Sequence, residues 1–324
     1  MADTPLNVRP EYATRQLNVN ADKRALVLFF GLAYAIAWIL WLPLVLSQNG
    51  LGVLPVNMSL AAGIPGAFAP CLAAYITQRW SCGNWRAVDW IQGWRRAWIG
   101  ILLAPLLLLL GQVVIPVLFL SKASAADLHW EALLKYPLWL LYPGVLLTSP
   151  LGEEPGWRGY ALPKLQRMIG PFWATMLLGV LWAVWHLPVF LVKGWTSASV
   201  PAFVLIVIGY STIITFVFNG SGSSVIAAVI AHSAANACSR FVGELLAGVP
   251  TRQGVSVVLV MALSLLGVSA LLVVFTRGRL GKSAPENEVD GTREDSAQDA
   301  EQAGCSEPGD DASVSIREPV APGR

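Results

Sequence analysis

The chain has 324 residues, of which 55% are hydrophobic and only 13% are charged. This composition lies outside the range of soluble globular domains, so we expect an integral membrane protein. The formal net charge is +2, and no basic patch interleaved with aromatic residues occurs, which argues against a nucleic-acid partner.

Apolar windows that are long enough to cross a bilayer recur along the chain. About 20 helical residues span ~30 Å of hydrocarbon, and continuous apolar runs favour helices over barrel strands. The clear windows are Ala25 to Ser47, Ser59 to Gln78, Ala97 to Leu120, Gly170 to Val192, Val200 to Phe218 and Gly254 to Thr276. Two weaker windows are Tyr136 to Gly152 and Ser223 to Phe241. The sequence therefore predicts an all-α, polytopic bundle of about eight transmembrane helices.

Three segments divide the chain by composition. Residues 1–24 are polar, and residues 25–276 form the predicted transmembrane domain. Residues 277–324 are rich in Glu, Asp, Gly, Ser and Pro and contain few large apolar residues, which predicts a disordered tail. Lys and Arg concentrate in alternate connecting segments, so the positive-inside rule places both termini in the cytoplasm.

A few ionisable and polar side chains interrupt the apolar windows or their ends. They are Glu153, Glu154, Arg158, His186, His232 and Asn236. A charged group near the bilayer centre costs at least ~2.5 kcal/mol on insertion scales, so residues of this kind are candidates for function. His129, the remaining histidine, falls in a charged outer loop, and we expect no role for it in a site.

The spacing of these residues predicts that they meet. Glu153 lies 17 residues before the expected turn at Gly170, and His186 lies 16 residues after it. At ~1.5 Å per residue, both side chains stand ~25 Å from the tip of an antiparallel helical pair. His232 and Asn236 are four residues apart and share a helix face. We expect these groups to converge on a pocket that opens toward the cytoplasm.

This mixture of groups suits peptide-bond hydrolysis. A carboxylate and an imidazole can hold and deprotonate a water, while a second imidazole and an amide can donate to the oxyanion. Glu154 and Arg158 are four residues apart and suit an ion pair that supports the site. Each residue also has a structural interpretation, as a juxtamembrane charge cluster, an interfacial histidine or an interhelical hydrogen bond. Their common predicted depth favours a functional site.

At these residues the chain resembles the CAAX protease and bacteriocin-processing (CPBP, or Abi) family of intramembrane proteases. Three family motifs occur in order: EExxxR as Glu153, Glu154 and Arg158; aromatic-x-x-x-His as Trp182 and His186; and HxxxN as His232 and Asn236. The resemblance covers roughly residues 148–236 and is close to one bacterial branch. The family often has Phe at the position of Trp182, and we interpret both residues as aromatic packing. Pro155 departs from a regular helix directly after the two glutamates.

The resemblance implies a role for each residue. Glu153 and His186 would activate the attacking water, His232 and Asn236 would form the oxyanion hole, and Glu154 and Arg158 would support them. The family has been described both as metalloproteases and as glutamate-dependent proteases without a metal. Zn²⁺, if present, would take the ligands Glu153, His186 and His232, although the HExxH motif is absent.

The sequence thus predicts an intramembrane endopeptidase of a bacterial plasma membrane. Its partners would be the lipid bilayer and a membrane-associated protein or peptide substrate, from CAAX-type or bacteriocin-related processing. One alternative is a non-catalytic membrane immunity or binding protein. Another is a proton-coupled transporter that uses buried Glu and His side chains. The sequence has no inverted pair of broken segments, which disfavours the transporter.

Overall fold

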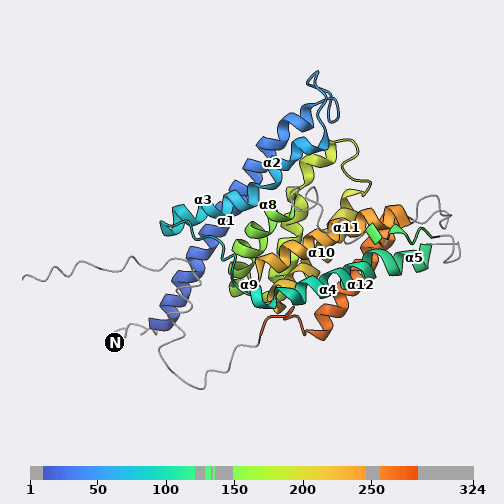
Figure 1. The fold of residues 1–324 in the computed structure, drawn as a ribbon. Coiled ribbons are helices and arrows are strands. Elements are labelled where there is room, and N and C mark those ends of the chain that lie inside the picture. The colour runs from blue at the N-terminus through green and yellow to red at the C-terminus, as the bar shows by residue number, and fades with distance from the viewer. Residues whose placement is uncertain (1–9, 121–127, 133, 136–148, 246–255, 284–324) are drawn as a thin grey trace, which may run out of the picture.

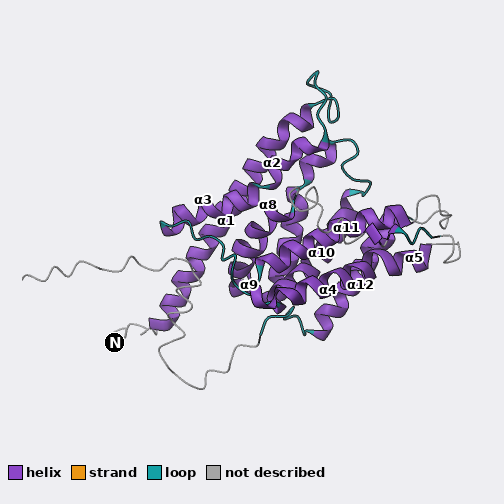
Figure 2. Cartoon of the chain, in the orientation of Figure 1, coloured by secondary structure: helices purple, strands orange, loops and turns teal. Residues whose placement is uncertain are grey.

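The computed structural model describes residues 10–120, 128–132, 134–135, 149–245 and 256–283. Within these ranges every regular element is helical (Figures 1 and 2). The α-helices are α1 (Pro10–Leu46), α2 (Ile64–Ala67), α3 (Ala69–Cys82), α4 (Ala97–Leu109), α5 (Ile115–Leu120), α8 (Pro150–Glu154), α9 (Leu162–Trp185), α10 (Val200–Gly220), α11 (Val225–Leu245) and α12 (Val257–Phe275). Two π-helical segments connect successive α-helices: Leu110–Val114 lies between α4 and α5, and Pro155–Ala161 lies between α8 and α9. Short 3-10 segments are Leu60–Gly63, Trp94–Arg96 and Leu187–Leu191.

Seven segments of the described chain are long and apolar enough to cross a membrane. They are Val19–Leu46, Leu60–Cys82, Trp94–Phe119, Pro150–Leu191, Val200–Gly220, Val225–Val242 and Val257–Phe275. They correspond to seven of the predicted windows, so the prediction of an all-α polytopic bundle is confirmed. The remaining window, Tyr136 to Gly152, falls mostly on residues 136–148, which lie outside the described residues.

The segment Pro150–Leu191 folds back on itself at Gly170. Its 42 residues are about twice the length that one crossing needs. Gly170 has φ 77° and ψ 167°, a backbone conformation that glycine tolerates and that breaks the helix. Contacts across this break, such as the hydrogen bond from Trp182 to Glu153, show that the two arms run antiparallel. The turn therefore lies where the Gly-Pro sequence predicts it.

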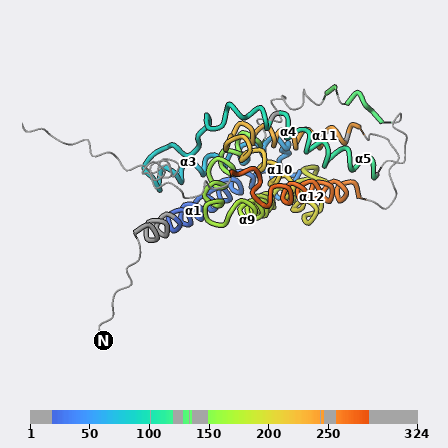
Figure 3. The backbone as a smooth tube through the Cα atoms, turned by 90° about the horizontal axis from the view of Figure 1, so that it is seen from below, coloured from blue at the N-terminus to red at the C-terminus, as the bar shows by residue number. Residues whose placement is uncertain are grey.

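Helix α11 is the central helix of the bundle. It packs against α4, α8 and α10, while α1 packs against α3, and α10 also packs against α9 and α12. Figures 1 and 3 show α1 and α3 at one end of the molecule and α5 and α12 at the other, with α9 and α10 between them. One face of α11 is lined by alanines without exposed surface: Ala227, Ala228, Ala231, Ala234, Ala235 and Ala237. Small side chains let helix backbones approach closely in a membrane.

The outer surface of the bundle is apolar. Large side chains that point outward include Val27, Ile39, Leu102, Leu118, Leu271, Val274 and Phe275. A soluble monomer rarely exposes so extensive an apolar surface, and in a bilayer these side chains meet lipid tails.

Pro155 changes the helix type at the start of the first arm. Proline has no N–H and clashes with the carbonyl one turn earlier, and the helix widens into the π-helical segment Pro155–Ala161. The prediction that Pro155 departs from a regular helix is therefore confirmed. Glycines let this arm lie directly on α3, because a Cβ on Gly156 would stand 2.4 Å from the carbonyl oxygen of Pro70.

Residues 277–283 continue the packed part of the chain beyond α12. Leu280 is completely buried, and Asn219 Nδ2 donates to its carbonyl oxygen at 2.9 Å. Lys282 Nζ donates to Gln166 Oε1 at 3.1 Å, and burial, together with nearby Arg167, lowers the pKa of this lysine. The disordered tail predicted from residue 277 therefore does not include these seven residues. Its remainder, residues 284–324, lies outside the described residues and stays a prediction.

Candidate active site

Glu153 is a buried carboxylate held by two indoles. It stands on α8, in the first arm of the hairpin, and its Oε2 accepts hydrogen bonds from Trp182 Nε1 and, at 3.4 Å, from Trp157 Nε1. Trp157 lies one turn along the same arm, whereas Trp182 comes from the second arm. An indole N–H can only donate, so this pair of donors suits an ionised carboxylate.

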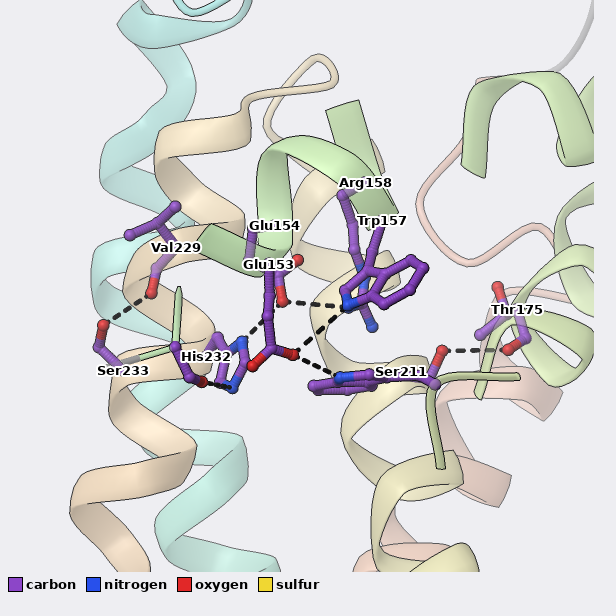
Figure 4. Close-up of polar contacts among 11 residues, drawn as sticks. Glu153, Glu154, Trp157, Arg158, Thr175, Ser211, Val229, His232 and Ser233 are labelled. Carbon is purple, nitrogen blue, oxygen red and sulfur yellow. Dashed lines mark hydrogen bonds and ion pairs between the residues drawn. The ribbon is translucent and has the colours of Figure 1, made fainter. Parts of the chain in front are cut away.

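Glu154 joins the hairpin to α11. Its Oε1 accepts from Arg158 Nη1 at 3.0 Å, which is the ion pair predicted from the four-residue spacing. The same oxygen lies 2.8 Å from His232 Nδ1 (Figure 4). All three side chains are buried. The bond between Glu154 and His232 was not predicted, because it joins two helices whose relative rotation the sequence does not encode.

His232 has a partner on each ring nitrogen. Since the Glu154 carboxylate accepts, Nδ1 carries a hydrogen, and this bond sets the ring orientation. The other nitrogen, Nε2, lies 3.1 Å from Ser149 Oγ. The backbone N–H of Glu153 donates to the carbonyl oxygen of Ser149 at 2.9 Å. No sequence motif indicated a role for Ser149. Only its position directly before α8 could have drawn attention to it.

Trp182 contacts most of the candidate residues. The Arg158 guanidinium lies 4.6 Å from its ring centroid in a cation–π contact. The rings of His232 and His186 lie 5.1 Å and 6.2 Å from it, centroid to centroid. The interpretation of Trp182 as a packing residue was therefore incomplete, since a phenylalanine would lack the N–H that Glu153 accepts.

We predict that Trp182→Phe destabilises the protein by roughly 1–3 kcal/mol, because it removes one donor from a buried carboxylate. Chemical unfolding in detergent micelles measures this loss. Trp173→Phe is the matched control, because Trp173 lies on the same helix but is largely exposed. Equal stability of the two variants would show that the indole N–H of Trp182 contributes nothing.

His186 lies at the end of α9 in an aromatic box. Its Nδ1 is 2.9 Å from the carbonyl oxygen of Trp182. The Trp195 ring stacks on it at 5.5 Å, and Trp41 stacks at 6.3 Å. Phe203 meets it edge-on at 5.3 Å.

Within the described residues Glu153 and His186 share no direct hydrogen bond, because Glu153 Oε2 accepts from the two indoles and His186 Nδ1 bonds to the carbonyl of Trp182. Their joint action on a water stays a prediction. A π-helix takes more residues per turn than an α-helix, so counting ~1.5 Å per residue along the first arm overestimates its length. Glu153 meets Trp182, which lies one turn before His186.

Asn236 lies one turn after His232 on α11, as its spacing predicts, and is partly exposed. A buried polar network holds the helix beside it. Gln112 Nε2 donates to the carbonyl oxygen of Ala235 at 3.3 Å, and Gln112 Oε1 accepts from Tyr210 at 2.7 Å and from Ser239 at 3.2 Å. This network was not predicted. His129 is exposed and bonds to Glu131, away from these residues.

The zinc set suggested by the resemblance does not fit this arrangement. Within the described ranges, no three His, Cys, Asp or Glu side chains form a group that could hold a metal ion. Glu153 Oε2 is taken by indoles, and His232 is bonded at both nitrogens.

Buried polar atoms without a hydrogen-bond partner lie at the same place. Among the described residues of the site they are Glu154 Oε2, Arg158 Nε and Arg158 Nη2. Such atoms are costly to bury and occur mainly where a site binds water or a ligand.

Two comparisons match the part of the chain that carries this site. Residues 135–238 match the family model Rce1-like, described as type II CAAX prenyl endopeptidase Rce1-like. A stretch of 99 residues is 32% identical to CAAX prenyl protease 2 of Methanococcus maripaludis, covering 27% of this chain and 35% of the relative. The chain thus spans about a third of the length of this curated relative. The family-model match includes Glu153, His186, His232 and Asn236.

Proposed function

We propose that the chain is an intramembrane endopeptidase of the CPBP family that hydrolyses a peptide bond in a membrane-associated protein or peptide, a proposal supported by the match of residues 135–238 to the Rce1-like family model. The observation that carries this proposal is the carboxylate of Glu153, which is buried in a membrane-spanning hairpin and held by two N–H donors. Burying a charged group in the membrane costs free energy, so its presence at this position favours a functional role.

Glu153 is the general base in this proposal. Its carboxylate takes a proton from a water as the water oxygen attacks the carbonyl carbon of the substrate. The protonated Glu153 then gives this proton to the amide nitrogen as the C–N bond breaks, which releases the amine and restores the carboxylate. The indoles of Trp157 and Trp182 hold the carboxylate in one orientation. His186 assists from the aromatic box. Because its Nδ1–H donates to the carbonyl of Trp182, its Nε2 is left as an acceptor that can hold the second hydrogen of the water.

His232 and Asn236 are the oxyanion donors. With Nδ1–H held by Glu154, His232 can donate through Nε2 when it is an imidazolium. In that form the charges of Glu153, Glu154, Arg158 and His232 sum to zero, which favours their joint burial. The Asn236 amide would supply a second donor from the next helical turn.

The test is cleavage of membrane-delivered peptides by the purified full-length protein in lipid vesicles. The relative's name, CAAX prenyl protease 2, makes a peptide with a prenylated cysteine the first substrate to try, with the same peptide lacking the lipid as its control. We expect turnover by the wild type. No cleavage of any peptide would favour the non-catalytic immunity or binding protein.

We predict that His186→Ala lowers kcat by about 10²–10⁴-fold, because the water loses one of the two groups that hold it. The control is His129→Ala, which should keep wild-type kcat because His129 lies outside the site. Wild-type turnover by the His186 variant would remove this residue from the mechanism. The same assay with a chelator tests the zinc alternative, since loss of turnover that Zn²⁺ restores would show that a metal is required.

A further inference from the structure

Ser149 stands where a serine usually caps a helix, but its hydroxyl has another use. A serine directly before a helix commonly accepts a hydrogen bond from a backbone N–H of the first turn. At the start of α8 this bond is not formed. The Ser149 hydroxyl instead lies 3.1 Å from His232 Nε2.

A hydroxyl is suited to this position by its hydrogen-bonding capacity. An ionised carboxylate only accepts, and an imidazolium only donates, whereas a hydroxyl donates and accepts at the same time. Ser149 can therefore accept from an imidazolium at His232, which a carboxylate-only acceptor would pair with at the cost of a further buried charge. Hydrogen bonds therefore run from the backbone N–H of Glu153 to Ser149, from Ser149 to His232 and from His232 to Glu154, and they join the start of α8 to α11.

The backbone fixes Ser149 relative to Glu153. The Ser149 carbonyl oxygen accepts from the N–H of Gly152 at 3.0 Å and from the N–H of Glu153 at 2.9 Å. Ser149 and Glu153 therefore belong to one helical turn and move together. Ser149 is half-buried, whereas Glu153 and His232 are buried, so Ser149 is the most accessible of the three.

We propose that Ser149 is a positioning residue that sets the distance between the base Glu153 and the oxyanion donor His232. In the free protein its oxygen occupies the place beside His232 Nε2 that the carbonyl oxygen of a substrate takes during the reaction. The inference rests on the proposed function and adds a residue to its site.

The experiment compares Ser149→Ala with Ser149→Thr, which keeps the hydroxyl. Misplacement of reacting groups by about 1 Å costs roughly 10²-fold, so we expect kcat of the alanine variant to fall about 10- to 100-fold with KM changed less than about twofold. The threonine variant should recover kcat to within about threefold of the wild type. The matched control is Ser256→Ala, because the Ser256 hydroxyl does cap its helix, accepting from the N–H of Leu259. This control should lose stability and keep kcat.

A second readout does not depend on turnover. The chain has three histidines, so the imidazole ¹⁵N spectrum of the labelled protein is simple to assign. Ser149→Ala should shift the Nε2 resonance of His232 and leave that of His129 unchanged. An unshifted resonance, or wild-type kcat in the alanine variant, would overturn the role of Ser149 while leaving the proposed function intact. Labelling of Ser149 by a fluorophosphonate, together with loss of all turnover in the threonine variant, would also overturn it, since Ser149 would then be a nucleophile.

Discussion

Replacing Glu153 with glutamine should lower kcat by about 10²–10⁴-fold while the protein stays folded, as expected for removal of a general base. Glutamine has nearly the same shape, and its side-chain oxygen can still accept the indole N–H of Trp182. It cannot take a proton from water. The measurement is kcat with saturating peptide in vesicles, next to the unfolding midpoint of the same preparation.

Glu244→Gln is the control for this substitution. Glu244 is exposed and pairs with Lys135 at the surface, so its loss should change kcat by less than about twofold. A Glu153→Gln variant with more than a tenth of the wild-type kcat would show that another group accepts the proton. The proposed mechanism would then lose its base, even if cleavage itself were established.

The second large effect concerns stability. Arg158→Met should destabilise the protein by about 3–5 kcal/mol, because it leaves the carboxylate of Glu154 buried without its cation. The variant also loses the cation–π contact with Trp182. His232 remains beside Glu154, so the site keeps one positive partner only when that ring is protonated. Chemical unfolding in detergent micelles measures the loss.

A double variant separates the charge effect from packing. Glu154→Gln combined with Arg158→Met removes both charges, and it should recover much of the stability that Arg158→Met alone loses. The matched single control is Arg167→Met, whose ion pair with Asp22 is partly exposed and should contribute less than about 1 kcal/mol. If Arg158→Met and Arg167→Met destabilised the protein equally, the buried ion pair of Arg158 with Glu154 would contribute no more to stability than an exposed pair.

Features that depend on neighbours along one helix were predicted well. The ion pair of Glu154 with Arg158 and the shared helix of His232 and Asn236 follow from a four-residue spacing, which brings side chains together in any α-helix. The turn at Gly170 follows from the conformational freedom of glycine and the break that proline imposes.

Contacts between helices were predicted less well. The equal-depth argument paired Glu153 with His186, but the structure gives Glu153 the indole of Trp182 and gives Glu154 the imidazole of His232. Which residue becomes a partner on another helix depends on how far each helix is rotated about its axis. The spacing of residues along the sequence does not determine this rotation.

The sequence by itself determined that this protein is an all-helical membrane protein, where most of its spans lie, and which few polar residues enter the apolar region. These properties follow from composition, the length of apolar runs and the cost of charge in lipid, all of which are local. Only the tertiary structure decided which carboxylate meets which imidazole, that Trp182 donates to Glu153, and that Ser149 contacts His232. Those partners are set by the packing of the hairpin against α11, whose small buried alanines let neighbouring backbones approach closely.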